Sequence, residues 1–391
     1  MDLNVAKLRS ETPGVAHRVH LNNAGAGLMP QTVLNAMVGY LTREAEIGGY
    51  EAAGEAADAL DGVYDSVARL LGAERDEIAL AENATVAWQL AFYGFDFQPG
   101  DRILTARAEY AANYVAFLQV AKRTGAVIEV VPDDSDGVLD PEALERMIDG
   151  RVKLIAITWV PTNGGLRNPA AAVGRIARRH GVTYLLDACQ AVGQMPTRVG
   201  ELGCDILTAT GRKFLRGPRG TGFLYVRREL LRMLEPPMLD HFAAPWVAPD
   251  RYELREDARR FETWENNYAA RLGLGRAIDY ALDLGLEAIE SRCRTLSTSL
   301  RAGLQAIPGV SLHDLGPDRA SIVTFTVGGR DPDALKARLA QSGYNISVSR
   351  PSSTLLDARA RQLPVVLRAS PHYYNTEDEL SRFVEAVSAT V

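Results

Sequence analysis

Lys213 is the residue whose setting first suggests chemistry. It lies in the stretch "TATGRKFLRGPRGTGFLYVR" (208–227), between an apolar run and a glycine-rich turn. Lysine is rare in this chain, with five among 43 basic residues, and the other four have ordinary surface settings. A lysine amine forms an imine with an aldehyde cofactor or substrate once burial or neighbouring cations lower its pKa. Lys213 is therefore a candidate nucleophile, and a solvated surface lysine is the alternative.

Asp187 and Gln190 form a second candidate group, in "TYLLDACQ" (183–190). The pattern puts Asp187 at the end of an apolar strand, where an unpaired carboxylate is costly to bury and needs a partner. A protonated pyridine nitrogen is one such partner, and the Gln190 amide can donate to a phenolate oxygen on the same ring. The alternatives are a turn or helix cap for Asp187 and a solvated loop position for Gln190.

Donors for a phosphate group are predicted at the opening of a helix in "ENATVAWQL" (82–90). Helix N-termini bind phosphate through free backbone N–H groups, here those of Ala84 and Thr85. Thr210 and Arg212, beside Lys213, can complete this set of donors. The alternative is a simple helix cap at Asn83. Neither "GPRGTG" nor "NNAGAG" has the sequence context of a nucleotide-binding loop.

The composition argues against several other classes of protein. The chain has 391 residues, 47% hydrophobic and 24% charged, which is the balance of a globular protein with two or three cores. Arginines and acidic residues are interspersed, which argues against a nucleic-acid-binding surface. The three cysteines form no CxxC motif, and no Cys/His cluster indicates a metal site. No apolar run is long enough to predict a membrane span or a secretory signal.

Alternating strands and helices must position the candidate residues. Strands are predicted at 77–81, 102–106, 127–131, 154–160, 183–188, 206–210 and 222–226, with helices between most of them. This alternation predicts an α/β fold with a mostly parallel seven-stranded sheet. The candidate residues follow the strands, at the edge where ligands collect in open α/β sheets.

A smaller α+β domain is predicted after a Pro-rich loop that starts near residue 236. A long helical stretch is expected at 266–306, followed by strands at 321–327, 346–349 and 365–370. The predicted division is an N-terminal arm and substrate loop at 1–30, a large cofactor-binding domain at 31–250 and a small C-terminal domain at 251–391.

These stretches together resemble the class V aminotransferase family of pyridoxal-phosphate enzymes (PLP fold type I), near cysteine desulfurases, selenocysteine lyases and isopenicillin-epimerase-like proteins. The resemblance runs from about residue 19 to 388. It is strongest in "LLDACQAVGQMP", "TGRKFLRGPRGTGFLYVR" and "LRASPHYYNTEDEL". The 26 residues that separate Asp187 from Lys213 match the spacing of that family.

The resemblance implies a role for each matching residue. Lys213 would be the catalytic residue that holds pyridoxal 5'-phosphate as a Schiff base, the internal aldimine, and shuttles the substrate α-proton. Asp187 would face the pyridine nitrogen, and Arg368 would bind the substrate carboxylate as a bidentate pair. The other cofactor-binding residues would be Ala84, Thr85, Tyr110, Thr162, Gln190, Thr210, Arg212 and Asn266, and the other substrate-binding residues Asn22, Ala24 and Gly25.

Two positions depart from the desulfurase pattern. Tyr110 stands where a histidine usually stacks on the cofactor ring, and Ser353 stands where the persulfide cysteine is expected. Because a thiolate has to attack the substrate sulfur, we expect a C–S lyase and not a persulfide-forming desulfurase. Such a lyase would eliminate the β-substituent of a cysteine S-conjugate or sulfoxide. The alternatives are a class V aminotransferase, an amino-acid epimerase, a decarboxylating oxidative deaminase and, from a different class, a non-catalytic binding protein.

The resemblance also implies a homodimer with a shared active site, a small amino-acid substrate, and no nucleic-acid or membrane partner. We expect a cytoplasmic location. The segment "RRFETWENNYAA" (259–270) corresponds to the one through which a family subunit reaches its partner's cofactor phosphate. Glu265 in that segment would repel a phosphate, which makes Asn266 or Asn267 the better candidate for the contact. The roles of Ser353 and His372 stay open.

Overall fold

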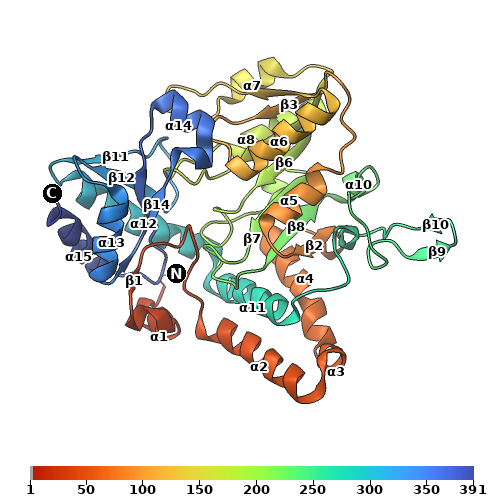
Figure 1. The fold of residues 1–391 in the computed structure, drawn as a ribbon, viewed down its shortest axis with the longest axis horizontal. Helices are drawn as coiled ribbons and strands as arrows, with labels where there is room; N and C mark the ends of the chain where they lie inside the picture. The colour runs from red at the N-terminus through yellow and green to blue at the C-terminus, as the bar shows by residue number, and fades with distance from the viewer. Residues whose placement is uncertain (1–2) are drawn as a thin grey trace.

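A computed structural model describes residues 3–391, and its largest element is a seven-stranded sheet (Figure 1). The strand order is β2-β8-β7-β6-β5-β3-β4. Neighbours are parallel except at β8, which is antiparallel to β2 and β7. The predicted mostly parallel seven-stranded sheet is confirmed. The strands are β2 (Ile78–Ala81), β3 (Arg102–Thr105), β4 (Val127–Val130), β5 (Val152–Thr158), β6 (Thr183–Asp187), β7 (Ile206–Thr210) and β8 (Gly222–Val226).

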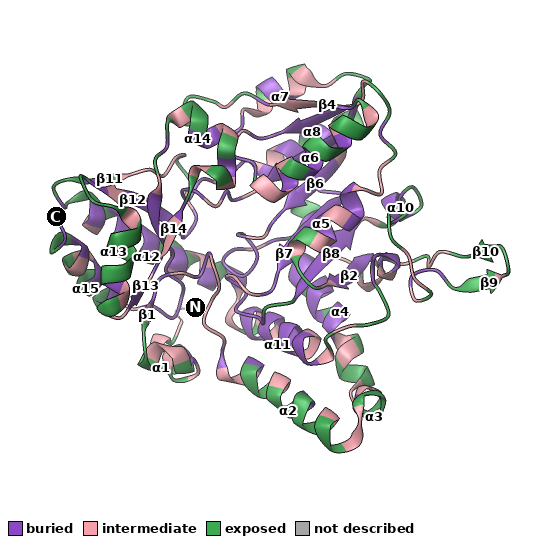
Figure 2. Cartoon of the chain, in the orientation of Figure 1, coloured by how far each residue is buried: buried purple, intermediate pink, exposed green. Residues whose placement is uncertain are grey.

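Helices cover both faces of this sheet. The covering helices are α4 (Ala57–Leu71), α5 (Ala84–Phe92), α6 (Ala111–Thr124), α7 (Pro141–Met147), α8 (Ala170–His180) and α11 (Tyr268–Leu284). Ile155 and Ile157 of β5 pack into a buried cluster with α4, α7, α8 and α11, whereas Leu154 and Ala156 pack into a second cluster with α5 and α6. Burial on both faces explains why β5 and its neighbours toward β8 are largely apolar without alternation, whereas the edge strand β4 is only partly buried (Figure 2).

A smaller antiparallel sheet forms near the C-terminus, in the order β11-β12-β15-β14. Its strands are β11 (Val310–Leu312), β12 (Val323–Val327), β14 (Ser347–Ser349) and β15 (Val366–Ala369), and its helices are α12 (Leu286–Gln305), α13 (Pro332–Gln341) and α15 (Glu377–Ser388). The single helical stretch predicted at 266–306 is wrong, because Gly285, with a φ of 82°, separates α11 from α12. Only glycine adopts this left-handed backbone without steric cost.

The division of the chain at residues 30 and 250 stays a prediction. α11 follows the second of these boundaries and packs against α4 and against α2, which precede it. The remaining elements are short or peripheral: α1 (Val5–Ser10), α2 (Gln31–Ile47), α3 (Gly49–Glu55), α9 (Val199–Leu202), α10 (Arg228–Leu231), α14 (Leu355–Arg361), β1 (Val19–His20), β9 (Trp246–Ala248), β10 (Arg251–Tyr252) and β13 (Tyr344–Asn345). The β9–β10 hairpin projects from the right edge of Figure 1.

The N-terminal arm links the two sheets. β1 pairs in parallel with β13, and Asn22 forms a bridge with Ser370, directly after β15. Further along the arm, the Gly27 N–H donates to the Arg212 carbonyl oxygen at 2.8 Å. The loop at 22–27 is therefore held between the end of β15 and the segment that follows β7.

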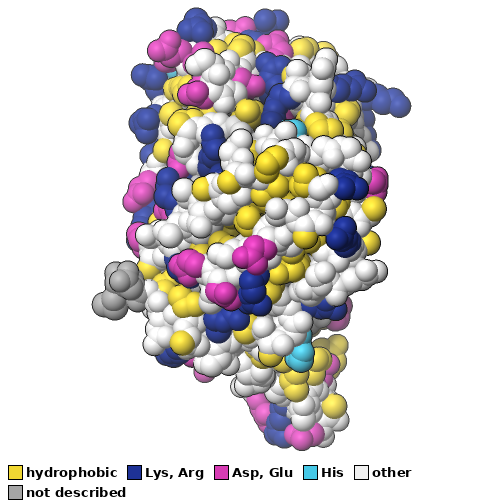
Figure 3. All heavy atoms as spheres, turned by 90° about the vertical axis from the view of Figure 1, so that its left-hand side faces the viewer, with side chains coloured by type: hydrophobic (Ala, Val, Ile, Leu, Met, Phe, Trp, Pro, Cys, Tyr) yellow, Lys and Arg dark blue, Asp and Glu magenta, His cyan; other side chains and the backbone are white. Residues whose placement is uncertain are grey.

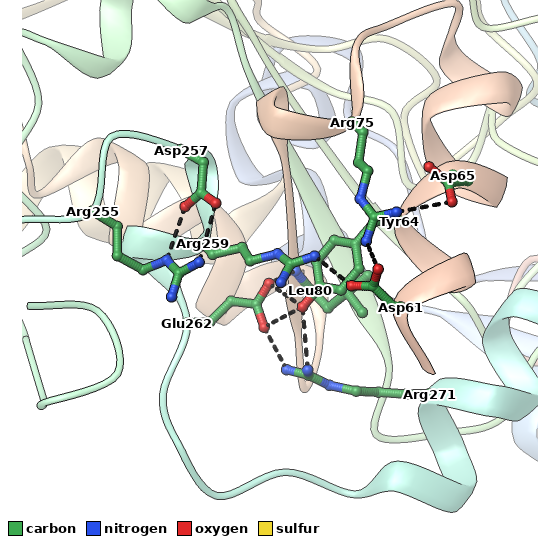
Figure 4. A network of polar contacts seen from close by, with 10 residues as sticks. All are labelled: Asp61, Tyr64, Asp65, Arg75, Leu80, Arg255, Asp257, Arg259, Glu262 and Arg271. Carbon is green, nitrogen blue, oxygen red and sulfur yellow. Dashed lines mark hydrogen bonds and ion pairs between the residues drawn. The ribbon is translucent and has the colours of Figure 1, made fainter. Parts of the chain in front are cut away.

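A buried polar network fastens the segment after the hairpin to α4 and β2 (Figure 4). The Glu262 carboxylate accepts from the Tyr64 hydroxyl at 2.8 Å and from the Leu80 N–H at 2.9 Å, and it pairs with Arg271 at 2.7 Å. The Arg259 guanidinium lies over the Tyr64 ring, 4.0 Å from its centroid. Because the Glu262 side chain has no exposed surface, these partners compensate a charge that would otherwise be costly to bury.

The outer surface has mixed charge. On the face drawn in Figure 3, acidic and basic side chains are scattered among hydrophobic and uncharged ones. Among residues 3–391, none of the helices combines the length and the apolar character that a membrane crossing requires.

Candidate cofactor and substrate site

The candidate residues meet at the carboxyl edge of the large sheet. β3, β5, β6 and β7 are parallel, so the segments that follow them lie side by side at one edge. These segments carry Tyr110, Thr162, Asp187 and Lys213. The edge corresponds to the position where open α/β sheets bind ligands.

Asp187 is a buried carboxylate with 5% of its surface exposed. One carboxylate oxygen accepts from the Asn113 side-chain amide at 2.9 Å, and the other accepts from the Cys189 backbone N–H at 2.9 Å. No ion pair with a basic side chain within 4.0 Å is found for Asp187 in residues 3–391. The hydrogen-bond partners of this carboxylate are neutral, and the N–H of a protonated pyridine would supply the counter-charge.

Lys213 lies in the β7–β8 connection and is half-buried. Burial lowers the pKa of its amine, and the positive charges of Arg212 and Arg368 lower it further, while Cys189 and Asp187 act in the opposite direction. A lower pKa increases the fraction of neutral amine, which is the nucleophilic form. Lys213 therefore has the environment of a reactive amine and not that of a solvated surface lysine.

His372 fixes the peptide that follows Lys213. Its Nε2 lies 2.6 Å from the Phe214 carbonyl oxygen, and its Nδ1 lies 3.2 Å from the Cys293 sulfur. Burial lowers the pKa of this imidazole to about 3, so the ring is neutral and Nε2–H is the donor to Phe214. His372 thus has structural contacts behind the lysine, and it is fully buried.

The predicted phosphate-binding residues converge from three segments. α5 begins at Ala84, and the Asn83 side chain accepts from the Val86 N–H at 3.0 Å. Gly222 lets this helix end lie against the sheet, because a Cβ there would come within 2.7 Å of the Asn83 carbonyl carbon and 2.9 Å of the Ala84 nitrogen. Thr210 pairs directly with Gly222. Backbone donors of Ala84 and Thr85 therefore lie close to the end of β7.

Thr210 and Arg212 already have partners within the chain. The Thr210 hydroxyl donates to the Thr221 carbonyl oxygen at 3.2 Å, which leaves its oxygen lone pairs free but commits its proton. The Arg212 guanidinium donates to the Gly25 carbonyl oxygen of the N-terminal loop. A bound phosphate would have to share or displace these two contacts.

Arg368 is buried at the other end of the site. Its guanidinium donates to the Thr162 hydroxyl, to the Thr162 carbonyl oxygen at 3.3 Å and to the Ser347 hydroxyl at 3.1 Å. Burial and the nearby Arg212 lower the pKa of Arg368 to about 10, while Tyr110 acts in the opposite direction. It has no carboxylate partner within 4.0 Å in the described chain, so a ligand carboxylate would supply its missing counter-charge.

The N-terminal loop lies between Arg368 and Gln190. The Ala24 N–H donates to the Ser370 hydroxyl at 2.9 Å, and the Ala24 carbonyl accepts from the Gln190 amide at 3.2 Å. The Gln190 Oε1 atom is buried and has no hydrogen-bond partner in residues 3–391, and the same is true of the Asn22 Oδ1 atom. Two unsatisfied buried acceptors in one loop region indicate that a polar group is missing there.

Asn266 is not brought to this site within one chain. Its side-chain amide donates to the Thr263 carbonyl oxygen at 2.6 Å, and its oxygen accepts from Arg271 at 2.5 Å. Arg271 belongs to the network of Figure 4, beside α4 and β2. The predicted role of Asn266 therefore depends on a second subunit.

Two residues of the site carry contacts that the sequence did not assign. Glu109 and Asn113 are both buried and lie beside Asp187 and Tyr110. Burial raises the pKa of Glu109 to about 7, with the Asp187 charge acting in the same direction. The only indication of this role in the sequence was an acidic residue directly before Tyr110. A linear pattern does not show which hydrogen-bond donors a buried carboxylate will contact.

Comparison with known proteins supports the same fold and family. The Aminotransferase class-V family model matches residues 19–383. A probable cysteine desulfurase of Xylella fastidiosa (strain 9a5c) is 32% identical over 97% of this chain and 94% of its own length. A cysteine desulfurase of Serratia proteamaculans (strain 568) is 31% identical over 98% of this chain and 97% of its own length. The structure of an apo cysteine desulfurase from Thermococcus onnurineus NA1 superposes with a TM-score of 0.92 at 26% identity, covering 100% of this chain and 98% of that one.

The expectation of a C–S lyase that is not a persulfide-forming desulfurase is wrong. Curated relatives that match nearly the full length of the chain are named cysteine desulfurases, and so is the superposed solved structure. The expectation rested on Ser353 alone, which lies in a short 3-10 helix at Pro351–Thr354. One side chain in a short turn says less about a reaction than a similarity that extends over 97% of the chain.

The polar groups of the site fit pyridoxal phosphate. Within residues 3–391 they combine a buried carboxylate and a half-buried amine that both lack an ion pair, an unsatisfied amide oxygen and a helix N-terminus. The family match extends over residues 19–383, which include all of these groups. The chain belongs to the class V aminotransferase family and is a pyridoxal-phosphate-dependent enzyme.

Proposed function

We propose that this protein removes the sulfur atom of cysteine, using pyridoxal phosphate. The observation that carries the proposal is that the edge of the sheet bearing Lys213 also has a buried carboxylate, Asp187, with only neutral hydrogen-bond donors and a buried guanidinium, Arg368, with only hydroxyl and carbonyl partners. This is an arrangement for an amino acid whose carboxylate meets Arg368 while its α-carbon lies near Lys213. The names of the relatives support cysteine as that amino acid.

Each residue would have a separate task. The cofactor, when bound, supplies an electron sink for the electrons released at the substrate α-carbon. Asp187 would hold the protonated ring nitrogen, and Tyr110 would cover one face of the ring. Arg368 would orient the substrate through its carboxylate, and the Lys213 amine would move the α-proton. Ala84, Thr85, Thr210 and Arg212 would hold the phosphate, Thr162 and Gln190 would contact the cofactor, and Asn22, Ala24 and Gly25 would line the substrate pocket.

The sulfur atom needs an acceptor thiol. Cys204 and Cys293 are buried, at 1% and 2% exposure, whereas Cys189 is half-buried beside Asp187. Burial and the neighbouring Asp187 charge raise the pKa of the Cys189 thiol, which disfavours its thiolate form. An assay should therefore supply an external thiol.

Incubation with L-cysteine, pyridoxal phosphate and dithiothreitol is expected to produce alanine and sulfide in equal amounts. Cysteine without its sulfur atom is alanine, so alanine is the product that defines desulfuration. Alanine is measured by amino-acid analysis and sulfide by methylene blue formation. Pyruvate and ammonia without alanine would instead show β-elimination, and this result would overturn the proposal. Heat-denatured enzyme with free pyridoxal phosphate is the control for reaction of the cofactor alone.

We also propose a homodimer in which Asn266 reaches the partner's cofactor phosphate. Leu34, Val38 and Leu41 of α2 are 42%, 52% and 52% exposed, and their spacing puts them on one helix face. Such a stripe of exposed apolar side chains is typical of a protein interface. The family resemblance supports the same assembly.

Sedimentation velocity is expected to give the mass of two chains for the wild type. The double substitution Val38→Glu and Leu41→Glu should shift the protein toward a monomer, because it would bury charges in the interface. The matched control is Leu355→Glu, which changes a 44% exposed leucine on α14. A wild-type monomer at micromolar concentration would contradict the dimer.

A cytoplasmic location is proposed on the basis of cysteine chemistry. All three cysteines are free, and two of them are buried without a disulfide partner. Unpaired cysteines are typical of proteins that work in a reducing compartment.

A further inference from the structure

Glu109 is the most highly connected carboxylate at the site. One oxygen, Oε1, accepts from the Tyr110 N–H at 3.0 Å, the Asn113 amide at 2.8 Å and the Thr158 hydroxyl at 2.5 Å. The other oxygen, Oε2, accepts from the Thr158 N–H at 2.8 Å and the Thr105 hydroxyl at 3.2 Å. Glu109 is 3% exposed, so this one buried side chain accepts from five donors, of which the Tyr110 N–H has a second, longer contact to the Thr158 hydroxyl at 3.3 Å.

These donors come from elements that must be held in register for the site to form. Thr105 ends β3, Thr158 ends β5, and Asn113 lies in the first turn of α6. Thr158 is also the direct pairing partner of Asp187 in β6. The Glu109 carboxylate thus joins β3, β5 and α6 at the edge of the sheet where the cofactor site lies.

The Asn113 side-chain amide connects the two buried carboxylates. It donates one N–H to Glu109 at 2.8 Å and the other to Asp187 at 2.9 Å. An amide nitrogen has two protons, so both are used, and the amide orientation is determined by the pair of acceptors. If either carboxylate is removed, the amide is no longer held from both sides, and its remaining hydrogen bond can change direction or lengthen.

We propose that Glu109 is a positioning residue that holds both the ring-nitrogen acid and the ring-stacking side chain of the cofactor site. It acts on Asp187 through the Asn113 amide, and on Tyr110 directly through the backbone N–H of that residue. The inference rests on the proposed cofactor contacts of Asp187 and Tyr110. Glu109 touches neither cofactor nor substrate in this scheme, and its effect is on where those two groups lie.

The test uses Glu109→Gln, Asn113→Ala and the double variant, each prepared as apoprotein. Glutamine keeps the shape of Glu109 but replaces one carboxylate oxygen by an N–H₂ group. The donors that faced this oxygen then have no acceptor. Affinity for pyridoxal phosphate is measured by equilibrium dialysis, and ring orientation is followed by the visible circular dichroism of the bound cofactor. Thermal unfolding of each apoprotein reports any general loss of stability.

Asp205 offers a matched control at the opposite edge of the same sheet. It is 5% exposed, accepts from the Tyr184 N–H of β6 at 2.8 Å and pairs with Arg227 at 2.8 Å. Asp205→Asn therefore removes a comparable buried charge that bridges strands, but on the side away from the cofactor. It should change thermal stability while leaving the cofactor affinity and the visible circular dichroism unchanged.

Each single variant is expected to weaken cofactor binding about tenfold, as substitutions behind a binding residue commonly do. Both should also change the visible circular dichroism of the bound cofactor. The double variant should bind the cofactor about as weakly as Glu109→Gln alone, because Asn113 lies on the path from Glu109 to Asp187 and the effect on Tyr110 is already lost in Glu109→Gln. Two results would overturn the inference while the proposed function stands. One is that both single variants keep the wild-type affinity and dichroism. The other is that the double variant binds the cofactor about 100-fold more weakly, which would indicate two independent effects. A wild type that binds no pyridoxal phosphate would overturn the proposed function itself.

Discussion

Lys213→Ala is expected to abolish cysteine desulfuration, with a loss of about 10⁴-fold or more in kcat/KM. The substitution removes both the amine to which the cofactor aldehyde attaches and the group that moves the substrate α-proton. The absorption of the bound cofactor should change as well, because the covalent attachment is lost. The measurement combines the alanine assay with the absorption spectrum of the dialysed protein.

The covalent attachment can also be located directly. Borohydride treatment of the loaded wild type, followed by peptide mass spectrometry, should find the cofactor on the peptide that contains Lys213. Lys153→Ala is the control, because Lys153 lies on an exposed position of β5 away from the carboxyl edge of the sheet. An adduct on another lysine, or full activity of Lys213→Ala, would contradict the assignment of this residue.

Arg368→Lys is expected to lower kcat/KM by about 100-fold, mainly through KM. Lysine retains the positive charge but cannot form the two parallel hydrogen bonds that a guanidinium makes to a carboxylate. Losing one partner of a buried charge pair costs about 2–5 kcal/mol, and a loss of about 100-fold in kcat/KM falls within this range. The effect should be specific for substrates with a carboxylate, because Arg368 has only hydroxyl and carbonyl partners of its own.

Steady-state kinetics with L-cysteine gives KM and kcat separately. The matched control is Arg350→Lys, since Arg350 is 56% exposed and pairs on the surface with Asp333 at 3.0 Å. An exposed ion pair contributes at most about 1 kcal/mol, so this variant should differ little from the wild type. An unchanged KM in Arg368→Lys would mean that the substrate carboxylate binds elsewhere.

The local pattern of the chain was sufficient for most of the large sheet. β7 and β8 have the bounds that their apolar runs predict, 206–210 and 222–226, and β6 differs by one residue. Strands buried on both faces are continuously apolar, and such runs can be recognised in the amino-acid sequence. The break at Gly285 and the β9–β10 hairpin were not predicted, because a single glycine or a short exposed pair of strands leaves little periodic signal.

The cofactor chemistry was similarly readable from residue types and spacing. Asp187 lies at the end of one predicted strand and Lys213 follows another, and parallel strands bring such positions to one edge. The reaction was not readable in that way. Ser353 suggested that desulfuration was excluded, and the relatives contradicted this, because a reaction depends on the whole pocket and not on one position.

The amino-acid sequence alone predicted the parallel sheet from its local pattern, and it predicted the kind of cofactor from residue types together with the family resemblance. The roles of Lys213 and Asp187 stay predictions. Only the tertiary structure decided which groups touch: that Arg368 rests on Thr162, that Gln190 meets the N-terminal loop, and that Asn113 joins Glu109 to Asp187. The physical reason is that a buried polar side chain takes its partners from segments far away in the chain, and those partners exist only after the sheets and the arm have packed together.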